Sequence, residues 1–113
     1  MEYDLEERTA AFSEKVITLC KKVPQDTITK PLISQLIRSA TSIGANYMEA
    51  NGASSRKDFK HKIFICKKEC RETKYWLRLL AKTVEKFTLE CRQLWKEAQE
   101  LTLIFSKIAI NTN

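Results

Sequence analysis

The sequence predicts an all-α protein, an antiparallel up-down-up-down four-helix bundle with helices at about 4–23, 31–51, 55–84 and 88–110. The 113 residues include only two Gly and two Pro, too few for the many turns of a β-sandwich or barrel. Apolar residues recur at alternating steps of four and three in each stretch, the spacing of a helix with one buried side. Because the connections are short, consecutive helices are expected to run antiparallel. The length suits a single domain, 1–113, with one core.

The first two helices each have a line of mainly apolar residues, here called the seam, that we expect in the core. The first helix begins near Asp4 and is stopped by Pro24, and the second takes Pro31 as its first residue with Lys30 or Thr29 as its cap. Gly44, inside the second helix, costs about 1 kcal/mol relative to Ala, and close approach of another backbone would offset that cost. The two seams are Leu5, Thr9, Phe12, Val16, Leu19 and Val23, then Ile33, Leu36, Ala40, Ile43, Tyr47 and Ala50.

The third and fourth helices continue the same spacing. The third follows Asn51-Gly52, with Ser54 or Ser55 as its cap, and Thr88 is the expected cap of the fourth. Between them the chain must turn without Gly or Pro. Their seams are Phe59, Ile63, Cys66, Cys70, Thr73, Leu77, Leu80 and Val84, then Phe87, Cys91, Leu94, Ala98, Leu101, Phe105 and Ile108.

The third helix carries the positive charge of the chain. Residues 54–84 hold ten basic and three acidic side chains, a net charge of +7, whereas the whole chain is +6. Lys60, Lys67 and Lys74 recur at every seventh residue, beside the seam. Such a stripe would neutralise phosphates without reading a base sequence. The candidate nucleic-acid-binding residues are Lys57, Lys60, Lys67, Lys68, Arg71, Lys74, Arg78 and Lys82.

Aromatic side chains lie among these cations. His61, Phe64 and Tyr75 could stack on unpaired bases, although each alone is typical of ordinary packing. A solvated helix face is the simplest alternative for the basic residues, and an acidic protein or a membrane surface is another.

The helices also carry more apolar residues than one core needs. Surplus apolar surface of this kind is typical of a protein that binds a partner, here another copy of the chain. A core face three positions wide would bury some of these residues within the bundle itself. The candidate subunit-interface residues are Ile65, Trp76, Leu79 and Trp95.

The composition argues against catalysis and cofactors. His61 is the only His, no Gly-rich phosphate loop is present, and no paired Glu-x-x-His motif exists for a di-iron site. Cys66 and Cys70 are four residues apart, but a structural zinc needs four ligands. Because the sequence has no secretion signal and a core large enough to do without disulfides, all four cysteines are expected to be reduced, and no metal, cofactor or catalytic residue is predicted. With an acidic N-terminus and no apolar run of about 20 residues, we expect a cytoplasmic protein away from membranes.

The segment from Gln35 to Ala50, followed by 55–59, resembles a known bacterial four-helix-bundle family. That family comprises proteins of intervening sequences in large-subunit ribosomal RNA and the accessory variability proteins of diversity-generating retroelements. Its hallmark is roughly R-[RS]-A-x-S-I-x-x-N-I-A-E-G and then K-D-F, and the segment from Glu72 to Leu77 is similar to its E-x-x-Y-x-L. This sequence departs at Tyr47-Met48 and at Ala50. The matching residues, expected to be structural, are Arg38, Ser42, Asn46, Glu49, Asp58 and Phe59.

The resemblance implies a cytoplasmic non-enzyme that forms a ring, typically a homopentamer. Accessory members of the family present a basic surface to nucleic acid and work with a reverse transcriptase. Our hypothesis is an oligomeric protein that binds nucleic acid nonspecifically through the third helix, with RNA favoured over DNA. The alternative is an oligomeric assembly or adaptor module, a partner of a reverse transcriptase or another acidic protein, without direct nucleic-acid binding.

Overall fold

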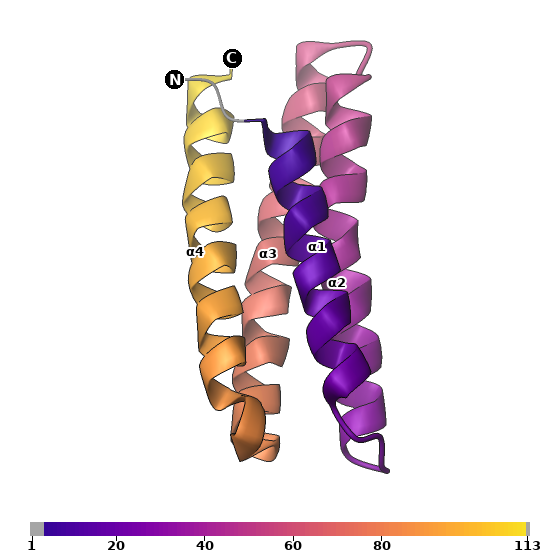
Figure 1. The fold of residues 1–113 in the computed structure, drawn as a ribbon. Coiled ribbons are helices and arrows are strands. Elements are labelled where there is room, and N and C mark those ends of the chain that lie inside the picture. The colour runs from indigo at the N-terminus through magenta and orange to yellow at the C-terminus, as the bar shows by residue number, and fades with distance from the viewer. Residues whose placement is uncertain (1–3, 113) are drawn as a thin grey trace.

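The computed structural model describes residues 4–112 and confirms the predicted all-α bundle within them. Neighbouring helices run in alternate directions, and the start of α1 lies at the same end as the end of α4 (Figure 1). The bundle measures 44 × 25 × 19 Å. Its elements are α1 (Leu5–Lys22), α2 (Thr29–Asn51), α3 (Arg56–Thr83), the short 3₁₀ helix η1 (Glu85–Phe87) and α4 (Thr88–Asn111).

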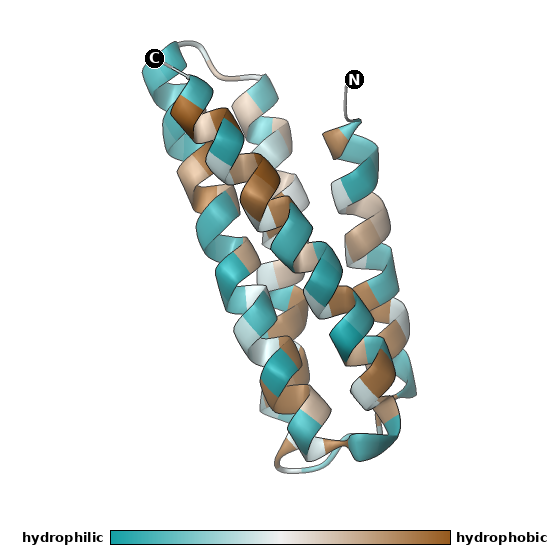
Figure 2. Ribbon diagram, turned by 90° about the vertical axis from the view of Figure 1, so that its left-hand side faces the viewer, coloured by the Kyte–Doolittle hydropathy of each residue, from teal (hydrophilic) through white to brown (hydrophobic). Residues whose placement is uncertain are grey.

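The predicted seams form the core. Every seam residue is buried except Tyr47, Phe59, Val84 and Ile108, which are half-buried against the core. Figure 2, in which the side that carries α4 faces the viewer, shows hydrophobic and hydrophilic segments alternating along the front helix. The four-three spacing therefore identified the buried side of all four helices.

The start of α2 differs from the prediction. Pro31 is the third residue of the helix rather than the first, and neither Thr29 nor Lys30 is its cap. Instead the Asp26 carboxylate accepts hydrogen bonds from the backbone N–H groups of Ile28 and Thr29, both at 2.8 Å, and the Asp26 N–H donates to Thr29 Oγ1. These bonds hold the pKa of Asp26 below its usual range. Pro31 is tolerated because N–H groups of the first turn have no partner within the helix.

The predicted cap of α3 is confirmed and that of α4 is wrong. Ser55 Oγ accepts from the Asp58 N–H at 3.0 Å, as a cap does. At the other end of α3 the chain reverses through η1. Thr88 is already helical, and its hydroxyl donates to the Ala81 carbonyl of α3 at 2.9 Å. The hydroxyl thus ties α4 to α3 instead of capping its own helix.

The helices contact one another unequally. α3 packs extensively on α2 and on α4, whereas α1 packs on α2 and makes few contacts with α4. The close approach expected at Gly44 is found within the bundle, because a Cβ there would lie 3.0 Å from Thr9 Oγ1 of α1. α3 is thus central to the packing, yet part of its surface faces away from the other helices.

Candidate nucleic-acid interface

Contacts divide the solvent-accessible part of α3 into two flanks and an outer face. Glu69 and Glu72 reach Arg38 of α2, which defines the α2 flank. Lys74 reaches Gln99 of α4, which defines the α4 flank. Helical spacing assigns the rest. The outer face, pointing away from both neighbours, comprises Lys57, His61, Phe64, Lys68, Arg71, Tyr75, Arg78 and Lys82, all exposed.

Charges are segregated between these surfaces. All three acidic residues of α3, Asp58, Glu69 and Glu72, lie on the α2 flank by their spacing. The outer face holds five exposed cations and no acidic residue. It extends for about 37 Å at about 1.5 Å per residue. A long, straight row of positive charge therefore crosses one side of the molecule.

The lysines at every seventh residue are not the most exposed cations. Lys60, Lys67 and Lys74 are each half-buried on the α4 flank. Lys74 Nζ donates to Gln99 Oε1, and it lies 5.3 Å from the centroid of the Trp95 ring. These contacts hold Lys74 against α4. The structure thus brings five of the eight predicted cations onto the outer face and places the other three beside it.

Two surface depressions adjoin the outer face. The first, of about 520 Å³, is lined by Phe64, Lys67, Lys68, Arg71, Glu72, Tyr75 and Trp76. The second, of about 1070 Å³, lies between the end of α3 and the start of α4, where Arg92 of α4 joins Arg78 and Lys82. Arg92 was not among the candidates predicted from the sequence. Arg92 directly follows the seam residue Cys91, so it lies at the edge of the buried side of α4, beside α3. This position next to the seam could have indicated Arg92 from the sequence.

The four predicted interface residues do not form one patch. Ile65, Trp76 and Leu79 are half-buried on the α2 flank, and Trp76 packs against the core. Trp95 belongs to α4 and lies on the opposite side of α3, beside Lys74. Trp76 Nε1 is buried and has no hydrogen-bond partner among the described residues. Trp76 therefore serves partly as core.

More exposed apolar side chains lie on the outside of α4. Leu89, Leu103 and Ile110 are 69%, 59% and 78% exposed, and their spacing of fourteen and seven residues puts them on one line of the helix. We call them the α4 line.

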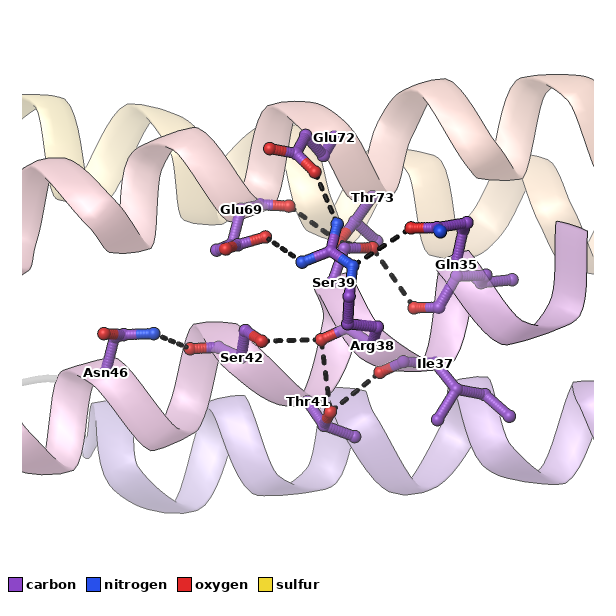
Figure 3. A network of polar contacts seen from close by, with 11 residues as sticks. Gln35, Ile37, Arg38, Ser39, Thr41, Ser42, Asn46, Glu69, Glu72 and Thr73 are labelled. Carbon is purple, nitrogen blue, oxygen red and sulfur yellow. Dashed lines mark hydrogen bonds and ion pairs between the residues drawn. The ribbon is translucent and has the colours of Figure 1, made fainter. Parts of the chain in front are cut away.

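Arg38 joins α2 to α3 (Figure 3). Its guanidinium lies between two carboxylates of α3, with Nη1 3.3 Å from Glu69 Oε1 and Nη2 bonded to Glu72 Oε1. Nε donates to Gln35 Oε1 of its own helix at 3.0 Å. Beside it, Thr73 Oγ1 lies 2.9 Å from Ser39 Oγ in the core. Arg38 thus supplies the positive charge that Glu69, buried in the bundle, needs.

The other motif residues have local roles. Ser42 Oγ donates to the Arg38 carbonyl, and Asn46 Nδ2 donates to the Ser42 carbonyl, so both bonds stay within α2. Glu49 forms an ion pair with Lys62 of α3 at 2.9 Å, which raises the pKa of Lys62. Asp58 lies in the first turn of α3, and Phe59 is half-buried against the core. These contacts join helices or complete turns within one subunit.

The cysteines are part of the core. All four are buried free thiols, and burial raises the pKa of Cys20 and Cys91 to about 11 and that of Cys66 and Cys70 to about 12. Across residues 4–112, no group of three or more His, Cys, Asp and Glu side chains is placed to hold a metal ion. In the same part of the chain, no helix has the length and apolar content to cross a membrane.

Fold and surface define a class of all-α four-helix-bundle proteins with a basic face on one helix. The chain belongs to the family described as 23S rRNA-intervening sequence protein, which matches residues 1–107. The family suggested by the second-helix motif is thereby confirmed.

Structural comparison agrees with this assignment. The crystal structure, at 1.70 Å resolution, of a protein with unknown function from the S23 ribosomal protein family of Bacteroides thetaiotaomicron VPI-5482 is similar at a TM-score of 0.82. The two sequences are 30% identical, and the match covers 92% of this chain and 96% of that one. A search of curated proteins finds no match.

Proposed function

We propose that this chain is a non-enzymatic, oligomeric, cytoplasmic protein that binds nucleic acid nonspecifically through the outer face of α3. The observation that carries the proposal is the segregation of charge on α3. Five exposed cations occupy the outer face, while Asp58, Glu69 and Glu72 all lie on the α2 flank. A row of cations with no intervening carboxylate attracts a phosphate backbone through release of its counterions. The family description names 23S rRNA, which favours RNA over DNA as ligand.

Hydrogen bonding separates the proposed contacts from the structural cations. Arg38 and Lys62 are held in ion pairs between α2 and α3, and Lys74 is held by Gln99. No ion pair is found for Lys68, Arg71 or Arg78 within residues 4–112. These three cations can therefore bind phosphates without breaking a contact that stabilises the fold.

A salt titration of RNA binding, followed by fluorescence anisotropy, tests the proposal. The logarithm of the affinity should fall linearly with the logarithm of the salt concentration, with a slope of about −0.7 per phosphate contacted on a single strand. The variant K68Q/R71Q/R78Q should bind more weakly and with a shallower slope. The control K21Q/K30Q/K107Q removes the same charge from exposed lysines of other elements and should retain the steep slope. Equal losses in the two variants would contradict a specific role for the outer face.

Self-association is the second part of the proposal. It is supported by the α4 line, three well-exposed apolar side chains on one side of a helix, together with the partly exposed Trp95. The pentamer expected from the resemblance would give a light-scattering mass five times the 13.1 kDa of the chain. Leu103→Ser with Ile110→Ser should lower that mass if the α4 line is the interface. A monomeric wild-type protein at micromolar concentration would contradict this part.

The α4 line also favours the alternative function, an assembly or adaptor module for a reverse transcriptase or another acidic protein. In that case the basic outer face would meet protein carboxylates. A stable oligomer that binds no nucleic acid at physiological salt would support the adaptor role over our proposal.

A further inference from the structure

We propose that the outer face takes single-stranded nucleic acid, with unpaired bases stacked on Phe64 and Tyr75. This inference rests on the proposed function and narrows its ligand. It is carried by the positions of the two aromatic side chains among the cations, by the depression between them and by the contact that holds Tyr75.

Phe64 and Tyr75 are exposed on the outer face, as His61 is, whereas Phe59 and Trp76 of the same helix are not. Phe64 is 50% exposed and Tyr75 is 53% exposed. Phe59 and Trp76, in contrast, pack against the core. The core therefore does not explain the first two rings, and their surface is available to a ligand.

The two rings lie on the same side of the helix with cations between them. They are eleven residues apart, close to three full turns, which separates them by about 16 Å along the axis. Lys68 follows Phe64 by four residues and Arg71 precedes Tyr75 by four, so one cation lies one turn from each ring. The depression of about 520 Å³ lies between the rings. A strand along this surface would meet a ring, two cations and a second ring in order.

The Tyr75 ring is held in place before any ligand arrives. It meets the Trp76 ring nearly edge-on, with centroids 5.0 Å apart and an interplanar angle of 67°. Because Trp76 is itself packed against the core, Tyr75 loses less rotational freedom on binding a base than a free side chain would.

Aromatic side chains discriminate between single and double strands. In a duplex each base is already stacked on its neighbours, so a helix lying along the outside meets mainly phosphates and sugars. In a single strand the base faces are free, and aromatic rings bind them with little dependence on sequence. The carboxylates of an acidic peptide would pair with Lys68 and Arg71, but Asp and Glu side chains offer no flat ring to Phe64 and Tyr75.

The test compares single and double strands on one protein. Fluorescence anisotropy would measure binding of oligouridylate and oligothymidylate, each alone and annealed to its complement. Wild-type protein should bind the single strands at least about tenfold more tightly, the ratio that 1.4 kcal/mol of stacking would produce. The variant F64L/Y75L keeps apolar bulk but loses both rings, and its single-strand affinity should fall about tenfold or more, to the level of the duplex.

Two controls isolate the rings. The exchange F64Y/Y75F keeps a ring at each position and should recover the preference. The variant I28A/M48A truncates two side chains of similar exposure, 60% and 62%, on other parts of the bundle and should retain it. Circular dichroism would verify that each variant is folded.

The outcomes separate this inference from the proposed function. Nucleic-acid binding that is equal for single strand and duplex, or that F64L/Y75L leaves unchanged, would overturn the inference while the proposed function stands. Binding only to polyglutamate, with no oligonucleotide bound, would overturn both.

Discussion

Arg8 of α1 and Glu97 of α4 form a bidentate ion pair between the two neighbouring helices that contact each other least. Arg8 Nε donates to Glu97 Oε2 at 2.9 Å, and Nη2 donates to Oε1 at 2.8 Å. Both side chains are only about a quarter exposed, and Glu100 lies 3.4 Å from the same guanidinium. Paired bonds to a carboxylate are stronger and better oriented than a single surface contact. Arg8 therefore closes the bundle where apolar packing is weakest.

Glu97→Gln is expected to lower the free energy of unfolding by about 1 kcal/mol at neutral pH, because the charged Arg8 exchanges a partly buried bidentate ion pair for a hydrogen bond to a neutral amide. Urea unfolding at a series of pH values would measure it. Glu14→Gln, at an exposed position of α1 for which no ion pair is found within residues 4–112, is the matched control and should change stability by less than about 0.5 kcal/mol.

The pH dependence of this difference has a definite sign. The hydrogen bonds from Arg8 hold the pKa of Glu97 below its usual range in the folded protein. The ionised carboxylate thus stabilises the fold above the unfolded pKa of about 4.3, and that stabilisation disappears as the pH falls through the folded pKa. The difference in the free energy of unfolding between wild type and Glu97→Gln should therefore become smaller as the pH falls. A constant gap from neutral pH to pH of about 3 would contradict the assignment.

Gly44→Ala is expected to destabilise the bundle despite the better helix propensity of Ala. Propensity alone would stabilise by about 1 kcal/mol. The new Cβ, however, would lie 3.0 Å from Thr9 Oγ1 and 3.3 Å from Thr9 Cβ. Thr9 has little freedom to move, because its hydroxyl is 2.6 Å from the Leu5 carbonyl and its side chain is buried. Overpacking of about 1–3 kcal/mol should therefore outweigh the gain.

A double-mutant cycle with Thr9→Ala tests the Gly44 contact. Removing the hydroxyl makes room for the new methyl group, so the two changes together should cost less than the sum of the single changes, by at least about 0.5 kcal/mol. Thermal unfolding followed by circular dichroism would supply the four free energies. Additive effects would show that Thr9 is not what limits Gly44.

Arg38→Leu is expected to lower the free energy of unfolding by about 2 kcal/mol. The loss is smaller than that from breaking a fully buried ion pair, because the Arg38 side chain is partly exposed. The reason for the loss is that Glu69, only 7% exposed, would keep its charge without its partner. The double variant R38L/E69L removes both charges and should recover most of the lost stability, as measured by urea unfolding. A double variant less stable than Arg38→Leu alone would show that Glu69 has another partner of greater weight.

The core was predictable from the sequence because it depends on the periodicity of each helix. The exposure of residues on the flanks of α3 was less predictable because it depends on which helices pack beside them. Ile63, Cys66 and Cys70 are buried as their spacing indicates. The same spacing places Lys67 beside the seam but does not show that α4 lies against it. Only the packing of α4 distinguishes a half-buried lysine there from an exposed Lys68.

The start of α2 shows a local limit of the same kind. Pro31 is a strong signal for a first helical position, but Asp26 competes by accepting two backbone hydrogen bonds and starts the helix earlier. The sequence did contain a signal for this earlier start, an Asp three residues before Thr29. The pair is a variant of the capping box in which the acid comes first and the hydroxyl residue three positions later. The Arg8–Glu97 pair had no such signal, since it joins residues far apart in the chain.

The four cysteines are expected to react slowly with a thiol reagent such as Ellman's reagent in the native protein. Each is buried, and burial raises each thiol pKa to about 11 or 12, so little thiolate is present at pH 8. In concentrated guanidinium chloride all four should react rapidly. The variant Ser34→Cys adds a thiol at an exposed position of α2 and should contribute one fast equivalent in the folded state. Rapid native labelling of more than that one thiol would show that the bundle opens readily. In that case α1, which packs on α2 and makes few contacts with α4, is the helix expected to separate.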